Sequence, residues 1–387
     1  MDRAAAKQQL DLLKIEVPSW AYGNSGTRFK VFAQPGVPRD PFEKVSDAAV
    51  VARLTGAVDS VALHIPWDKV EDYAVLAKHA AAEGITLGTI NSNTFQDNDY
   101  MLGSICHPEA RVRRKAIDHL LECVAIMDQT GSRDLKLWFA DGTNYPGQDD
   151  IRARQDRLQA GLEEVYAQLG DHQRMVLEYK FFEPAFYTTD IPDWGVSYAH
   201  CLRLGPKAMV VVDTGHHAPG TNIEFIVAFL LRERKLGAFD FNSRFYADDD
   251  LIVGASDPFQ LFRIMHEVVK ADAIDPVNGV AFVLDQCHNI EPKIPGQIRS
   301  ILNVQEAVTK ALLVDQAALT AAQLAGDVLG ANAILMDAYD TDVRPLLAEW
   351  RTDHGLDPDP MKAYAASGYA QKIATERVGG SQAGWGA

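Results

Sequence analysis

The sequence lacks the features that mark several large classes of protein. Its 387 residues include only four cysteines, and no two of them have the CxxC spacing of a zinc or redox motif. Cysteines scattered in this way predict reduced thiols in a cytosolic protein. No apolar run approaches the roughly 18 residues of a membrane span, and the charged N-terminal segment is unlike a signal peptide. We therefore expect a cytoplasmic protein without a membrane partner.

Positive charge is also scarce. The chain has 37 Lys and Arg against 53 Asp and Glu, which gives a formal net charge of −16. Because nucleic-acid phosphates select basic surfaces, this balance predicts no nucleic-acid partner. The Gly-rich phosphate loops GxGxxG and GxxxxGK[ST] are missing as well, which disfavours a doubly wound nucleotide-binding fold.

The sequence does contain a regular alternation of short apolar runs and amphipathic segments. Runs such as MVVVDT (209–214) and VAFVLDQ (280–286) are typical of strands buried on both faces of a parallel sheet. Segments of helical periodicity lie between them. Eight repeats predict an α/β fold, a closed (β/α)8 TIM barrel. The expected strands cover 19–22, 60–64, 86–90, 134–138, 175–180, 209–213, 238–242 and 280–285.

The chain becomes rich in Ala and Leu after the last repeat and keeps a helical pattern to about residue 374. Its last nine residues, GGSQAGWGA, have the composition of a linker. We expect a barrel catalytic domain over 1–315. We expect additional C-terminal helices with a flexible tail over 316–387, packed on the barrel or on a neighbouring subunit.

Polar residues follow the expected strands at the end where such a barrel places its active site. They are His64, Asn91, Asn93, Trp138, Glu178, Lys180, Asp213, His216, Asp240, Asn242, Asp248, Asp250 and Asp285. Six carboxylates in one bowl would repel one another unless cations compensate. Mixed oxygen and nitrogen ligands suit Mn²⁺, Mg²⁺ or Co²⁺. The pattern predicts a divalent-metal site of one or two ions.

Glu178 and Lys180 are two positions apart on one expected strand, so their side chains project to the same face. A salt bridge that merely closes the barrel mouth would have the same spacing. The position at a strand end favours instead a metal ligand beside a substrate lysine. A Schiff base at Lys180 is disfavoured, because acidic neighbours keep its pKa high.

Two further groups of candidate ligands follow later strands. Asp213 and His216 flank a Gly turn after a buried strand, which favours ligation, whereas His217 is expected to lie outside the ligand set or to pack in the core. Asp248 and Asp250 belong to an acidic run that would elsewhere be an exposed loop. Their place just past a strand end makes them candidate ligands too.

Aromatic residues at strand ends have two interpretations. Trp20, Phe95 and Trp138 could pack in the core, or they could form the stacking wall of a sugar site. The Gly-rich loop GNSGTRFKVFAQPG (23–36) carries Phe29 and Phe32 where a solvated loop should be polar. Exposed aromatics on a loop predict docking onto another surface, here a neighbouring active site.

Six motifs together resemble the bacterial L-rhamnose isomerases of the xylose-isomerase-like barrel superfamily. They are VPSWAYGNSGTRF, VALHIPWD, LWFADGTNYPGQ, LEYKFFEPAFY, VVDTGHHAPGTNIE and FNSRFYADDDL. The resemblance implies a homotetramer that uses two divalent cations per subunit, Mn²⁺ or a similar ion. It implies interconversion of an aldose and its 2-ketose, with L-rhamnose, L-mannose, L-lyxose and D-allose as candidate sugars.

The resemblance also implies roles for individual residues. A structural metal would be held by Glu178, Asp213, Asp285 and Asp240, the last standing where the family has a histidine. A second, catalytic metal would share Glu178 and be held by His216, Asp248 and Asp250. The sugar site would be lined by Trp20, His64, Phe95, Trp138 and Lys180, with Phe29 reaching in from the adjacent subunit. The candidate catalytic residues are Lys180, His64, Asp250 and Asp285.

Several alternatives stay open at this point. The hydrogen could move between C2 and C1 as a hydride, which the superfamily analogy favours, or through a cis-enediol that needs a carboxylate base. A sugar epimerase on the same barrel would typically place two glutamates across its substrate, and only Glu178 is evident. The negative charge disfavours a nuclease for abasic DNA. A secreted, non-catalytic sugar-binding protein would need an export signal.

Overall fold

The computed structural model describes residues 3–27, 30–181 and 188–378. Eight parallel strands close into a barrel in the spatial order β1-β12-β11-β10-β8-β6-β5-β4. Their bounds are β1 (Ile15–Pro18), β4 (Val58–Ile65), β5 (Thr86–Ser92), β6 (Asp134–Leu137), β8 (Arg174–Glu178), β10 (Ala208–Asp213), β11 (Leu236–Phe241) and β12 (Ala281–Leu284). The predicted (β/α)8 barrel is confirmed.

One predicted strand is wrong. Residues 19–22 form a 3-10 helix, η1 (Ser19–Tyr22), and the first barrel strand lies just before them. Pro18 ends that strand, because proline has no N–H to donate to a sheet ladder. The other seven predicted strands agree with observed strands to within two residues at each end.

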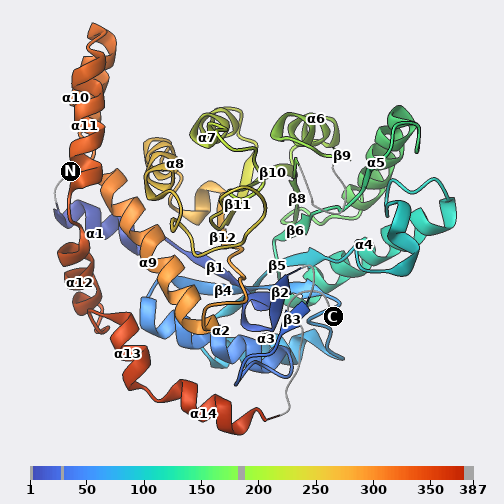
Figure 1. The fold of residues 1–387 in the computed structure, drawn as a ribbon, viewed down its shortest axis with the longest axis horizontal. Helices are drawn as coiled ribbons and strands as arrows, with labels where there is room; N and C mark the ends of the chain where they lie inside the picture. The colour runs from blue at the N-terminus through green and yellow to red at the C-terminus, as the bar shows by residue number, and fades with distance from the viewer. Residues whose placement is uncertain (1–2, 28–29, 182–187, 379–387) are drawn as a thin grey trace.

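A helix follows each barrel strand and packs on the outside of the barrel (Figure 1). These helices are α2 (Pro41–Thr55), α3 (Tyr73–Ala82), α4 (Ala110–Thr130), α5 (Ile151–Tyr166), α6 (Trp194–Leu204), α7 (Ile223–Arg232), α8 (Pro258–Lys270) and α9 (Lys293–Leu312). Six of the eight begin at an Asp or Asn whose side chain accepts a hydrogen bond from a backbone N–H of the first turn. Part of the acidic excess therefore serves as helix caps.

Shorter elements connect these units. They are the hairpin β2 (Ser25–Thr27) with β3 (Lys30–Phe32), the pair β7 (Gly142–Thr143) with β9 (Thr188–Thr189), and the 3-10 turns η2 (Asn98–Leu102) and η3 (Pro276–Asn278). Among the described residues, no helix is long and apolar enough to cross a membrane.

The N-terminal helix and the C-terminal helices lie along one side of the barrel. They are α1 (Arg3–Leu12), α10 (Gln316–Ala325), α11 (Val328–Asp340), α12 (Arg344–Asp353), α13 (Pro360–Ala366) and α14 (Tyr369–Glu376). α10 and α11 project away from the barrel, whereas α12 to α14 run past α9 and α2 (Figure 1). Trp350 and Tyr364 join the same hydrophobic core as the barrel strands. Whether 316–387 is a separate unit from 1–315 stays a prediction.

Alternation along the strands carries polar side chains into the barrel. In β11, Phe239 and Phe241 stack on Phe282 in the hydrophobic core that includes the outer helices, so Ala238 and Asp240 point the other way, into the barrel. Ala238 packs there with Val176 and Val211, each two residues before an acidic residue on its own strand. The barrel interior thus has an apolar layer below and a charged layer at the carboxyl ends of the strands.

Candidate active site

The predicted metal ligands gather at the carboxyl ends of neighbouring strands. Ligand atoms of Glu178, Asp213 and His216 lie within 4.8 Å of one another, and those of Asp213, Asp240 and Asp285 do the same. All of these residues except Asp285 are less than 9% exposed, and Asp285 is intermediate. Asp213 belongs to both groups, so the two form one continuous cluster.

Asp248 and Asp250 join this cluster from the loop after β11. Asp248 Oδ1 lies 3.3 Å from His216 Nε2, and Asp250 Oδ1 accepts a 3.4 Å hydrogen bond from Asn242 Nδ2. Asp250 has a φ of 45°, a left-handed conformation that is uncommon for a residue other than glycine. Such strain is often found at functional sites, where surrounding contacts hold it in place.

The cluster carries more negative charge than its own cations balance. Burial, together with Glu178 and Asp248, raises the pKa of the Asp213 carboxyl to about 6, although His216 opposes the shift. Burial and the neighbouring carboxylates also raise the pKa values of Asp250 and Asp285 well above the usual range. Burial disfavours the charged ring of His216, but Asp213 and Asp248 outweigh that effect and raise its pKa. Additional positive charge would therefore stabilise the cluster.

This donor set fits divalent cations. Glu178, Asp213, Asp240 and Asp285 offer only carboxylate oxygens, which suit hard ions such as Mg²⁺ and Mn²⁺. The group that contains His216 adds an imidazole nitrogen, which Mn²⁺ and Co²⁺ also accept. A bound cation would relieve the repulsion that raises the carboxyl pKa values.

Two lysines face the acidic cluster. Lys180 donates a 2.7 Å hydrogen bond to Asp248 Oδ2, and its Nζ lies 5.1 Å from the centre of the Trp138 ring. Lys136 forms a buried ion pair with Asp240. Burial lowers the pKa of the Lys136 ammonium, but Asp240, Glu178 and Asp285 outweigh burial and raise it. Lys136 is therefore charged, and Lys180 forms an ion pair with Asp248.

Aromatic side chains form the other wall of a pocket of about 540 Å³, a volume that includes its open mouth. His64 stacks on Trp67 with ring centres 3.8 Å apart, and Phe95 meets Trp138 edge-on at 4.9 Å. Burial and the Lys44 charge lower the pKa of His64, so its ring is neutral. An apolar wall facing a polar floor is the usual form of a site for small polar ligands.

The pocket collects most of the residues predicted to bind substrate. Its walls include Trp20, His64, Phe95, Trp138 and Lys180, and its floor includes Glu178, His216, Asp240, Asp248 and Asp285. Asp213 and Asp250 are buried beside the floor but do not line the pocket. Phe29 lies outside the described residues.

Sequence reasoning missed three residues that line the pocket: Trp67, Ser92 and Lys136. Lys136 precedes Trp138 by two positions, the spacing that paired Glu178 with Lys180, and this signal could have identified it. Trp67 lies in the same VALHIPWD segment as His64. Ser92 ends β5 and carries no comparable signal.

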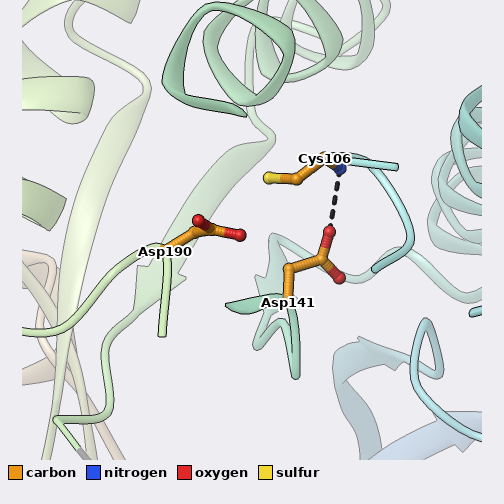
Figure 2. A group of neighbouring side chains, drawn as sticks. All are labelled: Cys106, Asp141 and Asp190. Atoms are coloured by element: carbon orange, nitrogen blue, oxygen red, sulfur yellow. Dashed lines mark hydrogen bonds between the residues drawn. The ribbon is translucent and has the colours of Figure 1, made fainter. Parts of the chain in front are cut away.

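A second cluster of ligand-type side chains lies apart from the pocket, and Figure 2 shows its members Cys106, Asp141 and Asp190. Their hydrogen-bonding groups are already engaged. Asp141 accepts 2.8 Å hydrogen bonds from the backbone N–H groups of Ser104 and Cys106. Asp190 accepts a 2.7 Å hydrogen bond from Arg154, and burial raises the pKa of the Cys106 thiol. These contacts tie together the loops that carry the three residues.

We expect Arg154→Met to destabilise the protein by about 3–5 kcal/mol, because it leaves the buried Asp190 carboxylate without its partner. Urea unfolding followed by circular dichroism measures the change. Arg152→Met, at an exposed position on the same helix, is the matched control and should alter the free energy of unfolding by less than about 0.5 kcal/mol. Equal effects of the two substitutions would contradict a structural role for the ion pair.

The fold and this pocket together define the chain as a (β/α)8-barrel protein whose catalytic face is built for small polar ligands and cations. The sequence matches the L-rhamnose isomerase (RhaA) family over residues 64–355. The chain belongs to this family and is a sugar isomerase.

Curated relatives and solved structures agree with this placement. A probable sugar isomerase of Rhizobium meliloti (strain 1021) is 44% identical over 97% of this chain and 89% of its own length. A probable sugar isomerase of Mesorhizobium japonicum is 42% identical over 97% of this chain and 90% of its own. The structure of an L-ribulose 3-epimerase superposes with a TM-score of 0.57 at 14% identity, covering 78% of this chain and 97% of that one. At that identity the likeness shows the barrel fold alone.

Proposed function

We propose that the pocket interconverts an aldose and its 2-ketose, with L-rhamnose and L-rhamnulose as the principal pair. D-Allose with D-allulose, L-mannose and L-lyxose are the further substrates we expect. The observation that carries the proposal is the arrangement of an acidic floor, Lys180 and an aromatic wall around one small pocket. Membership of the L-rhamnose isomerase family supports the choice of sugar.

The proposed cofactor is a pair of divalent cations, Mn²⁺ or else Co²⁺ or Mg²⁺. One site would be held by Glu178, Asp213, Asp240 and Asp285. The other would share Glu178 and be held by His216, Asp248 and Asp250. When bound, such cations polarise the sugar carbonyl and lower the pKa of the adjacent hydroxyl.

The side chains of this chain do the remaining work. The Lys180 ammonium binds a sugar oxygen near the reacting carbons, and neutral His64 makes a hydrogen bond to the sugar from the aromatic wall. Asp285 on the pocket floor and Asp250 buried beside it hold and return the hydroxyl proton. Trp20, Phe95 and Trp138 exclude water, which favours direct hydride transfer between C2 and C1 over a cis-enediol.

The test is an isomerisation assay on protein stripped with a chelator and then reloaded with Mn²⁺, using L-rhamnose and D-allulose separately. We expect no turnover without metal, turnover with it, and retention of a C2 deuterium label in the product. Loss of the label to solvent would favour the enediol. Conversion of D-allulose to a C3 epimer would make the enzyme an epimerase, and tight Mn²⁺ binding without any turnover would refute the isomerase assignment.

We also propose a homotetramer in which Phe29 of one subunit completes the pocket of its neighbour. Light scattering after size-exclusion chromatography measures the mass of the assembly. A monomer with full activity would refute the proposal.

A further inference from the structure

Lys136 is a charged residue of the pocket wall that takes no part in the chemistry proposed above. It lies on β6, and its side chain is only 3% exposed. Its partner Asp240 lies on β11, which is separated from β6 in the barrel by β8 and β10. The ion pair therefore spans the barrel interior instead of linking adjacent strands.

The ion pair lies beside the other carboxylates of the proposed oxygen-only metal site. Asp240 has ligand atoms within 4.8 Å of Asp213 and Asp285, so its carboxylate would add to their repulsion. Lys136 cancels that charge, because a buried Lys–Asp pair carries no net charge. Nζ of Lys136 also lies 5.9 Å from the centre of the Trp20 ring, so aromatic surface bounds the pair on another side. The low dielectric of this buried position strengthens the attraction between the two charges.

With two divalent cations bound, the positive and negative charges of the site are equal. The pocket lining and the proposed metal ligands together contain six carboxylates, those of Glu178, Asp213, Asp240, Asp248, Asp250 and Asp285, and two lysines, Lys136 and Lys180. His216 is neutral when it binds a metal, so it adds no charge. Two ammonium groups against six carboxylates leave four negative charges, which two divalent cations neutralise. Without Lys136 the same cations would leave one carboxylate uncompensated.

We propose that Lys136 is a positioning residue whose positive charge offsets the negative charge of Asp240. Asp240 then contributes an oxygen ligand to the oxygen-only metal site but adds no net negative charge to it. Lys136 thereby limits how tightly that site holds its cation. This inference rests on the proposed function, because it takes these carboxylates to bind a divalent ion. In this role Lys136 sets the affinity of the site for its cation and does not bind the sugar.

The test is a double-mutant cycle read by Mn²⁺ binding instead of activity. Metal-stripped full-length protein is titrated with Mn²⁺ by calorimetry for the wild type, Lys136→Met, Asp240→Asn and the double variant. We expect Lys136→Met to bind Mn²⁺ about tenfold more tightly, because a cation beside the site is removed. We expect Asp240→Asn to bind about 100-fold more weakly, because it loses a ligand and leaves Lys136 unpaired beside the ion.

The double variant tests whether the Lys136 charge alone weakens Mn²⁺ binding. Both Asp240→Asn and the double variant lack the carboxylate, so they differ only in the Lys136 charge. We expect the double variant to recover at least about tenfold in Mn²⁺ affinity over Asp240→Asn. This comparison stands even if Lys136→Met alone does not fold without metal. Equal affinities of the two variants would overturn the inference.

Lys235→Met is the matched control, a buried lysine at the opposite end of the barrel. Its Nζ donates hydrogen bonds to the carbonyl oxygens of Gly205 and Ala208, at 2.7 and 2.8 Å. We expect its Mn²⁺ affinity to equal that of the wild type, and a change as large as that of Lys136→Met would overturn the inference. If the wild type itself binds no Mn²⁺, the proposed function fails instead, so the two failures are distinct.

Discussion

Glu178→Gln is expected to lose both bound Mn²⁺ and isomerase turnover. Glu178 Oε1 lies 3.0 Å from His216 Nδ1, and its ligand atoms lie within 4.8 Å of those of Asp213 and His216. In the proposed scheme it serves both cations. The substitution keeps the shape of the side chain and removes its charge. We expect Mn²⁺ affinity to fall by more than about 100-fold, the upper end of what outer partners of a metal ligand contribute.

Metal content after desalting, measured by mass spectrometry, and the rate with L-rhamnose together check this expectation. Glu349→Gln is the control, since Glu349 is half exposed and pairs with Arg3 and Lys7 on the outer surface. It should keep full metal content and activity. Wild-type metal content and turnover in Glu178→Gln would remove Glu178 from the site.

The sequence was sufficient to predict the barrel and most of the pocket for a common physical reason. Parallel strands buried on both faces are continuous apolar runs, as in 209–213, and a polar residue that ends such a run lies at the rim of the sheet. In a closed parallel barrel all of these ends meet on one face. Asp213 and Asp285 could therefore be placed together although they belong to different repeats.

The contacts that could not be predicted depend on which side chains meet across the barrel. Lys136 and Asp240 are 104 positions apart and lie on strands that are not neighbours, so no local pattern pairs them. Asp240 could be identified as a candidate metal ligand, but its partner Lys136 could be found only from the closed barrel. The error at 19–22 has a local cause: Trp20 and Tyr22 favour strands, yet Pro18 ends the ladder just before them.

Lys180→Met is expected to separate chemistry from metal binding. Lys180 Nζ lies 2.7 Å from Asp248 Oδ2 and faces the Trp138 ring, which places its charge between the acidic floor and the aromatic wall. If that charge stabilises a sugar oxygen during the reaction, its removal should lower kcat by about 10²–10⁴-fold, as for a lost acid–base group. Mn²⁺ content should change far less, because Lys180 is not a ligand.

The ratio of these two effects identifies what Lys180 does. Lys362→Met, an exposed position on α13, controls for loss of a lysine in general and should leave both quantities unchanged. A fall in Mn²⁺ content that matches the fall in kcat would mean that Lys180 acts by holding Asp248 in place. A fall in kcat with the metal retained requires that the ammonium act on the sugar itself. The same pocket would then use its two lysines differently, Lys180 in the reaction and Lys136 in the charge balance of the metal site.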